Sequence, residues 1–79
     1  MEIKILGKGC SKCQRLEELA RAAAAEAGVE ATFTKVKELD DIIAYGVAVT
    51  PALVIDEDLK CSGRIPQKSE IVAWIQAAE

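Results

Sequence analysis

Hydrophobic and polar residues alternate at the start of the chain and then change to a helical period. Glu2 to Leu6 alternates charged and apolar side chains, which predicts a short strand. Ser11 to Ala27 predicts a helix, because Ser11 and Gln14, three positions apart, fit a capping box at its start. Gly28 ends this helix, and its apolar face is expected to hold Leu16, Leu19, Ala20, Ala23 and Ala27.

The middle of the chain predicts a second strand and a short second helix. Val29 to Val36 is rich in β-branched residues and begins with alternating apolar side chains, as strands do. Leu39, Ile42 and Ile43 then have helical spacing, and Gly46 closes that helix.

The last part of the chain predicts a hairpin and a final helix. Ala52 to Ile55 is continuously apolar, which is typical of a strand buried on both faces. The acidic connection Asp56-Glu57-Asp58 is short enough to join it, as a hairpin, to a strand from Leu59 to Ser62. Pro66 opens the last helix at a permitted first-turn position, and the expected buried face of that helix is formed by Ile71, Trp74, Ile75 and Ala78.

This order of elements predicts an α/β fold of the βαβαββα type. A βαβ unit makes a parallel strand pair, and the hairpin adds antiparallel strands to the same sheet. We therefore expect a four-stranded mixed sheet flanked by three helices on both faces. A chain of 79 residues has room for one core, so residues 1–79 are expected to form a single domain.

Composition and charge narrow the classes of function. The net charge is -3, with Lys and Arg scattered among acids, which argues against binding to nucleic acid. The chain has no histidine, which excludes nucleophiles activated by histidine and the commonest metal ligand. We find no signal peptide and no apolar run near the ~18 residues of a membrane span, so we expect a cytoplasmic protein that does not bind membranes.

Two of the three cysteines are spaced to work together. Cys10 and Cys13 form a Cys-x-x-Cys motif where a strand gives way to a helix, the context of a redox pair in a reducing compartment. The helix N-terminus stabilises a thiolate, so Cys10 is the expected nucleophile and Cys13 the resolving thiol. Lys8, Ser11 and Lys12 are the candidate thiolate-stabilising residues.

Other uses of these thiols remain open from the residues alone. Two thiolates at a loop before a helix can hold a soft ion such as Cu(I), as in small metal-chaperone domains. A structural zinc site is disfavoured because it needs four ligands and the chain lacks histidine. The pair could also merely pack, or it could regulate binding to a partner through its disulfide state. Cys61 alternates with Leu59 and is expected to lie on the core face of its strand as a small hydrophobe.

Several segments together resemble the thioredoxin and glutaredoxin fold. These are Gly9-Cys10-Ser11-Lys12-Cys13 after a strand, Val49-Thr50-Pro51-Ala52-Leu53-Val54-Ile55, and Gly63-Arg64-Ile65-Pro66. The resemblance covers essentially the whole chain. More narrowly, the chain is similar to the small thioredoxin-like redox-active disulfide proteins of archaea and bacteria.

The resemblance implies a function and a substrate platform. It implies a thiol–disulfide oxidoreductase that needs no cofactor and no metal, and whose Thr50–Pro51 bond is cis and faces the cysteine pair. The backbone of Thr50 would then pair with an extended substrate segment. The implied partners are a disulfide-containing protein or small thiol substrate, and a reductase or low-molecular-weight thiol as electron donor. The chain is expected to be a monomer.

Three departures from better-known members of the fold concern the substrate and the redox potential. Gly9 stands where thioredoxins have a tryptophan, and Ser11-Lys12 stands where they have Gly-Pro. The glutathione-binding Gly-Gly of glutaredoxins is reduced to Gly63 followed by Arg64.

Overall fold

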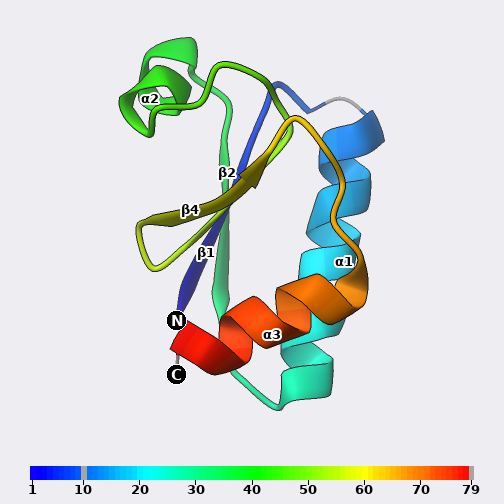
Figure 1. Cartoon of the computed structure of the whole chain (residues 1–79). Coiled ribbons are helices and arrows are strands. Elements are labelled where there is room, and N and C mark those ends of the chain that lie inside the picture. Colours follow the sequence, from blue (N-terminus) through cyan, green and yellow to red (C-terminus); the bar gives the residue numbers. More distant parts are fainter. Residues whose placement is uncertain (10, 79) are drawn as a thin grey trace.

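The computed structural model describes residues 1–9 and 11–78, which form three helices and four strands (Figure 1). In chain order these are β1 (Glu2–Leu6), α1 (Ser11–Ala27), β2 (Thr32–Val36), α2 (Leu39–Ala44), β3 (Ala52–Ile55), β4 (Asp58–Ser62) and α3 (Lys68–Ala78). The predicted order of strands and helices is confirmed.

The four strands form one mixed sheet in the order β2-β1-β3-β4. β1 runs parallel to β2, and β3 runs antiparallel to both of its neighbours. A parallel pair needs a long crossover connection, which α1 supplies, whereas antiparallel β3 and β4 need only a tight turn. In that turn Asp56 and Glu57 have φ values of 49° and 68°, the left-handed values of a two-residue hairpin loop.

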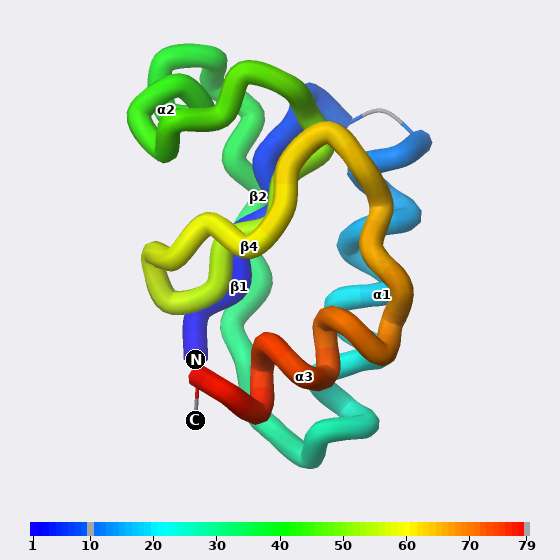
Figure 2. Tube along the Cα trace, viewed as in Figure 1, coloured from blue at the N-terminus to red at the C-terminus, as the bar shows by residue number. Residues whose placement is uncertain are grey.

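Helices cover both faces of this sheet. α1 and α3 pack against each other on one face (Figures 1 and 2), where Leu53 and Ile55 of β3 join the larger apolar core. α2 lies on the other face, where Ala52 and Val54 join a smaller core that includes Ile42. Because successive strand residues point to opposite faces, β3 is buried along its whole length, as predicted.

The second strand is shorter than predicted, since β2 begins at Thr32 and not at Val29. The N–H of Val29 donates to the carbonyl of Ala24 at 3.0 Å, so Val29 forms part of the turn that ends the helix after Ala27. Pairing with the first strand starts when the N–H of Thr32 donates to the carbonyl of Met1 at 2.9 Å. The connection from the helix to β2 therefore includes Val29, which the β-branched pattern assigns to the strand.

The prediction that Leu59 and Cys61 share the core face is wrong for Leu59. Cys61 is buried in the larger core, but Leu59 is 38% exposed. The register between β3 and β4 shifts, so that Leu53 pairs with Cys61 while Val54 pairs with Leu59. This irregularity inserts one extra residue into β4 and thereby places Leu59 and Cys61 on opposite faces of the sheet.

The start of the last helix differs from the prediction. α3 begins at Lys68, so Pro66 is not in its first turn; Gln67 stands before the helix, and its N–H donates to the carboxylate of Glu70. Pro66 is instead buried ahead of the helix. α1 begins at Ser11, as predicted, but Ser11 is then the first helical residue and not the residue before the helix, where a capping side chain stands. On the predicted apolar face of α3, Ile71 and Ile75 are buried, Trp74 is half-buried and Ala78 is exposed. On that of α1, Leu19 and Ala27 are half-buried.

Candidate functional site: the entrance of α1

The predicted site lies where the loop after β1 enters α1. Lys8 in this loop and Ser11 and Lys12 in the first turn of α1 are all exposed. Cys10 lies outside the described residues. The role of these three exposed residues in stabilising a thiolate stays a prediction. The first turn of α1 has no acidic side chain that would oppose a negative charge there, which favours this prediction.

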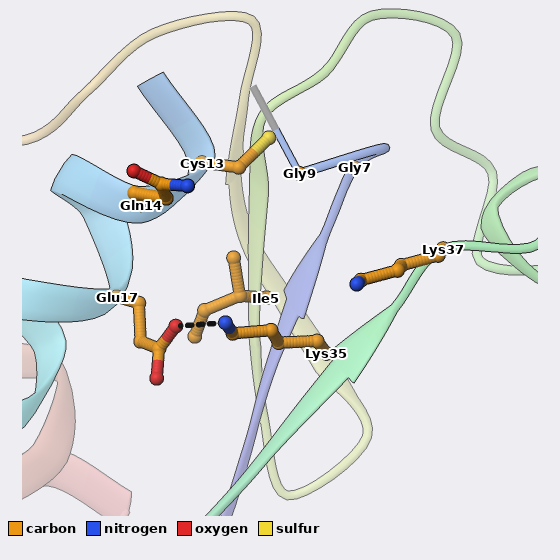
Figure 3. Close-up of a pocket in the computed structure, with 8 residues that line it drawn as sticks. All are labelled: Ile5, Gly7, Gly9, Cys13, Gln14, Glu17, Lys35 and Lys37. Atoms are coloured by element: carbon orange, nitrogen blue, oxygen red, sulfur yellow. Dashed lines mark ion pairs between the residues drawn. The ribbon is translucent and has the colours of Figure 1, made fainter. Parts of the chain in front are cut away.

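Cys13 is the third residue of α1 and is only 5% exposed. Its side chain extends from the helix toward the loop of Gly7 and Gly9 (Figure 3). Buried Leu16 and Ala20 follow on the same helix and anchor this end of α1 in the larger core. A rigid, packed helix therefore holds the predicted resolving thiol in the wall of a pocket.

The predicted substrate platform lies next to the same loop. The Thr50–Pro51 peptide bond is cis, as the family resemblance implies. Pro51 is buried while Thr50 is exposed, and the carbonyl of Pro51 accepts a hydrogen bond from the N–H of Gly63 at 2.9 Å. The fold therefore brings the Thr50–Pro51 segment and the entrance of α1, which are far apart in the chain, to the same end of the sheet.

Gly7 is a residue of this site that the sequence analysis did not single out. Its N–H donates to the carbonyl of Val36 at 2.9 Å, which continues the pairing of β1 with β2 beyond the strand end. A Cβ atom at Gly7 would lie 2.2 Å from the Sγ of Cys13 and 3.7 Å from the Cβ of Thr50. Gly7 is thus close to both Cys13 and the predicted substrate platform.

The pocket beside Cys13 also contains charged side chains that were not predicted. Glu17 follows Cys13 by one helical turn, and its carboxylate lies 3.0 Å from the ammonium group of Lys35 on β2 (Figure 3). Lys37 lines the same pocket. The spacing of Cys13 and Glu17 could have indicated a shared helix face, but the place of the lysines depends on the register of β2 with β1.

A second, larger groove lies beside Thr50. It is lined by Lys8, Thr50 and apolar residues of α2 and the loop after it, including Leu39 and Ile43. Leu39 and Ile43 are 55% and 58% exposed, which is unusual for large aliphatic side chains on one short helix. The groove therefore joins an apolar surface to the predicted substrate platform.

Cys61 belongs to the core and not to the site. It is 8% exposed, and burial is the main cause that raises the pKa of its thiol, against a lowering effect of nearby Arg64. Arg64 itself pairs with Glu70 at 2.8 Å and stays half exposed. The predicted packing role of Cys61 is confirmed by its place in the larger core.

A mixed sheet of this order, with a Cys-x-x-Cys motif at the entrance of its first helix and a cis-proline beside it, defines a thioredoxin-like protein. The family model described as a thioredoxin domain matches residues 1–76, and the chain belongs to that family. It is a thiol–disulfide oxidoreductase that acts on disulfide substrates.

Two archaeal relatives cover most of the chain. A thioredoxin of Methanothermobacter thermautotrophicus is 46% identical over 71 residues, which span 90% of this chain and 92% of the relative. A thioredoxin of Methanocaldococcus jannaschii is 36% identical over 69 residues, which span 87% of this chain and 79% of the relative. In the described part of the chain, no helix is long and apolar enough to cross a membrane.

Proposed function

We propose that the protein reduces disulfides in other proteins through Cys10 and Cys13. The thiolate of Cys10 attacks one sulfur of the partner's disulfide, forms a mixed disulfide and expels the other partner sulfur as a thiolate. The thiolate of Cys13 then attacks the Cys10 sulfur and releases the second partner thiolate. The partner gains two electrons, and the Cys10–Cys13 dithiol becomes a disulfide that an external thiol donor reduces.

The observation that carries this proposal is the setting of Cys13. It is buried at the start of α1, next to Gly7 and on the side facing Thr50. A thiol at this place is shielded from bulky attackers and reaches only a disulfide formed beside it, which suits a resolving residue. Lys8, Ser11, Lys12 and the N-terminus of the α1 dipole would stabilise the thiolate of Cys10.

The substrate platform would be the segment of Thr50 and Pro51. Thr50 is exposed and precedes a buried proline, so its backbone is available to a partner segment in extended conformation. The groove along Leu39 and Ile43 continues from this platform and would receive apolar side chains that flank the partner's cysteine. The occupant that we propose is therefore an extended, partly apolar segment of a disulfide-bearing protein.

The wider setting follows from the same chemistry. We propose that residues 1–79 act as a single monomeric domain in the cytoplasm, because a dithiol that delivers electrons must be kept reduced. Either a dedicated reductase or a low-molecular-weight thiol would return the electrons.

A turnover assay with a protein disulfide tests the proposal. The assay is run once with a thioredoxin-reductase system and once with glutathione, and the consumption of the electron donor is measured. Cys10→Ser should abolish turnover, and Cys13→Ser should trap a mixed disulfide that mass spectrometry detects. The matched control is Cys61→Ala, which should turn over like the wild type. Turnover that survives Cys10→Ser would exclude the mechanism.

A further inference from the structure

We propose that Gly7 is a positioning residue that forms the seat of the Cys13 sulfur, and that this seat sets the rate of the resolving step. The proposal rests on the proposed function of Cys13. Its structural basis is a steric overlap. A Cβ atom added at Gly7 would lie only 2.2 Å from the Sγ of Cys13.

The overlap involves the sulfur alone. Nonbonded carbon atoms pack at about 3.5 Å or more. The same Cβ would lie 3.6 Å from the Cβ of Cys13 and 3.7 Å from the Cβ of Thr50, which are ordinary contacts. A methyl group at residue 7 would therefore overlap with the Cys13 sulfur, in addition to the strain that any side chain meets at the φ of 156° found there.

The sulfur has few other places to go. The backbone of Cys13 is held in α1, so the sulfur can leave Gly7 only by rotating about the Cα–Cβ bond. Side chains occupy staggered rotamers, and one of the three is rare in helices. A side chain at residue 7 would therefore move the sulfur by a whole rotamer step and not by a small adjustment.

That movement affects only the second half of the reaction. The attack of the Cys10 thiolate on a disulfide does not use Cys13. In the resolving step, the Cys13 thiolate forms a bond to the Cys10 sulfur while the bond from Cys10 to the leaving thiolate breaks, which requires close alignment of three sulfurs. Misplacing a reacting group by about 1 Å can cost ~100-fold in rate.

The kinetic test uses a chromogenic aromatic disulfide in stoichiometric amount, with Cys61→Ala as the background for every variant. Each reaction releases one coloured thiolate when Cys10 attacks and a second when Cys13 resolves the mixed disulfide. Gly7→Ala should leave the first phase unchanged and slow the second by ~100-fold. A second phase at the wild-type rate would overturn the proposal.

Gly28→Ala is the matched control variant. Gly28 also has a positive φ, 71°, but a Cβ there would meet no atom within 4 Å. A side chain is strained by the positive φ at both positions, 156° at Gly7 and 71° at Gly28, but only the one at Gly7 would touch the sulfur. Both phases of Gly28→Ala should therefore keep the wild-type rates. If Gly28→Ala slowed the second phase as much as Gly7→Ala, the effect would come from general destabilisation and the proposal would be overturned.

A stability comparison tests the seat without using the reaction. Gly7→Ala is made in the wild type and in Cys13→Ala, and the denaturant midpoint is measured for all four proteins. The loss of stability should be smaller in the Cys13→Ala background, because the sulfur that causes the overlap is gone. Equal losses would show that no such seat exists. If the wild type released no coloured thiolate, the proposed function would fail while this comparison still decided the seat.

Discussion

The carboxylate of Glu17 lies 3.0 Å from the ammonium group of Lys35, and this ion pair joins α1 to β2 in the pocket beside Cys13. Arg21 adds a second ion pair to Glu17 at 2.9 Å. The hydrogen bond from Lys35 is the largest cause that lowers the pKa of Glu17, with Arg21 acting in the same direction and burial opposing both. The side chain of Glu17 is only 16% exposed, so water screens the pair with Lys35 incompletely.

The lowered pKa of Glu17 predicts a specific dependence of stability on pH. The unfolded chain binds a proton at Glu17 before the folded chain does, so the stabilisation is present above the ordinary pKa of 4.5 and is lost as pH falls below it. Glu17→Gln should lower the free energy of unfolding at neutral pH and flatten its decline in acid, as measured by urea unfolding at several pH values. The control is Glu18→Gln, on the exposed side of the helix, which should have a smaller effect at neutral pH.

Lys12 predicts an electrostatic effect on the nucleophile. It lies exposed in the first turn of α1, where a positive charge adds to the favourable field of the helix N-terminus. Lys12→Gln should raise the pKa of Cys10 by roughly half a unit, measured from the ultraviolet absorbance of the thiolate. Lys68→Gln makes the same charge change near Glu26, at the other end of α1, and should leave that pKa unchanged. Equal shifts in the two variants would contradict a local effect.

The apolar groove predicts a difference between large and small substrates. Ile43 is 58% exposed, and its burial under a partner segment would contribute to the binding free energy. Ile43→Asp should therefore raise KM for a protein disulfide about tenfold. The rate with a small aromatic disulfide should not change, because that substrate does not reach α2. Leu59→Asp is the control, since Leu59 is also exposed but lies on β4 near the hairpin turn. A similar increase of KM in both variants would exclude the groove as a binding surface.

The burial of Cys61 predicts that its thiol is inert in the folded protein. At 8% exposure and with a pKa raised by burial, it should react with iodoacetamide only after unfolding, as followed by mass spectrometry in native and denaturing buffer. Cys61→Ser should cost about 1 to 3 kcal/mol of stability because it buries a hydroxyl group in an apolar core. Labelling of the native protein at the rate of an exposed thiol would contradict this.

Much of the fold was readable from local patterns. The alternation in β1, the helical period of α1 and the apolar run of β3 predicted the bounds of these elements, because each signal lies within the element itself. The errors in the bounds of elements fall at their ends. Val29 was assigned to a strand but completes the exit of α1, and Pro66 was assigned to a helix that begins at Lys68. At such ends the hydrogen bonds of the neighbouring segment decide the conformation, and local propensity does not report them.

The candidate site was readable in part. The Cys-x-x-Cys spacing at a helix start predicted the chemistry, and the Thr50–Pro51 pair gave the resemblance to the thioredoxin fold. Neither Gly7 nor Lys35 carries a signal in the sequence that links it to Cys13. Both belong to the site through contacts between segments that are distant in the chain.

The sequence by itself determined the order of strands and helices, the paired thiols and the family, because hydrophobic period and motif spacing act over a few neighbouring residues. Only the tertiary structure decided which residues meet at the site and that Leu59 lies on the face of the sheet opposite Cys61. The register shift that separates Leu59 from Cys61 and the contact of Gly7 with the Cys13 sulfur both arise from packing between distant segments. Such packing depends on the shapes of both partners at once, so neither segment contains it alone.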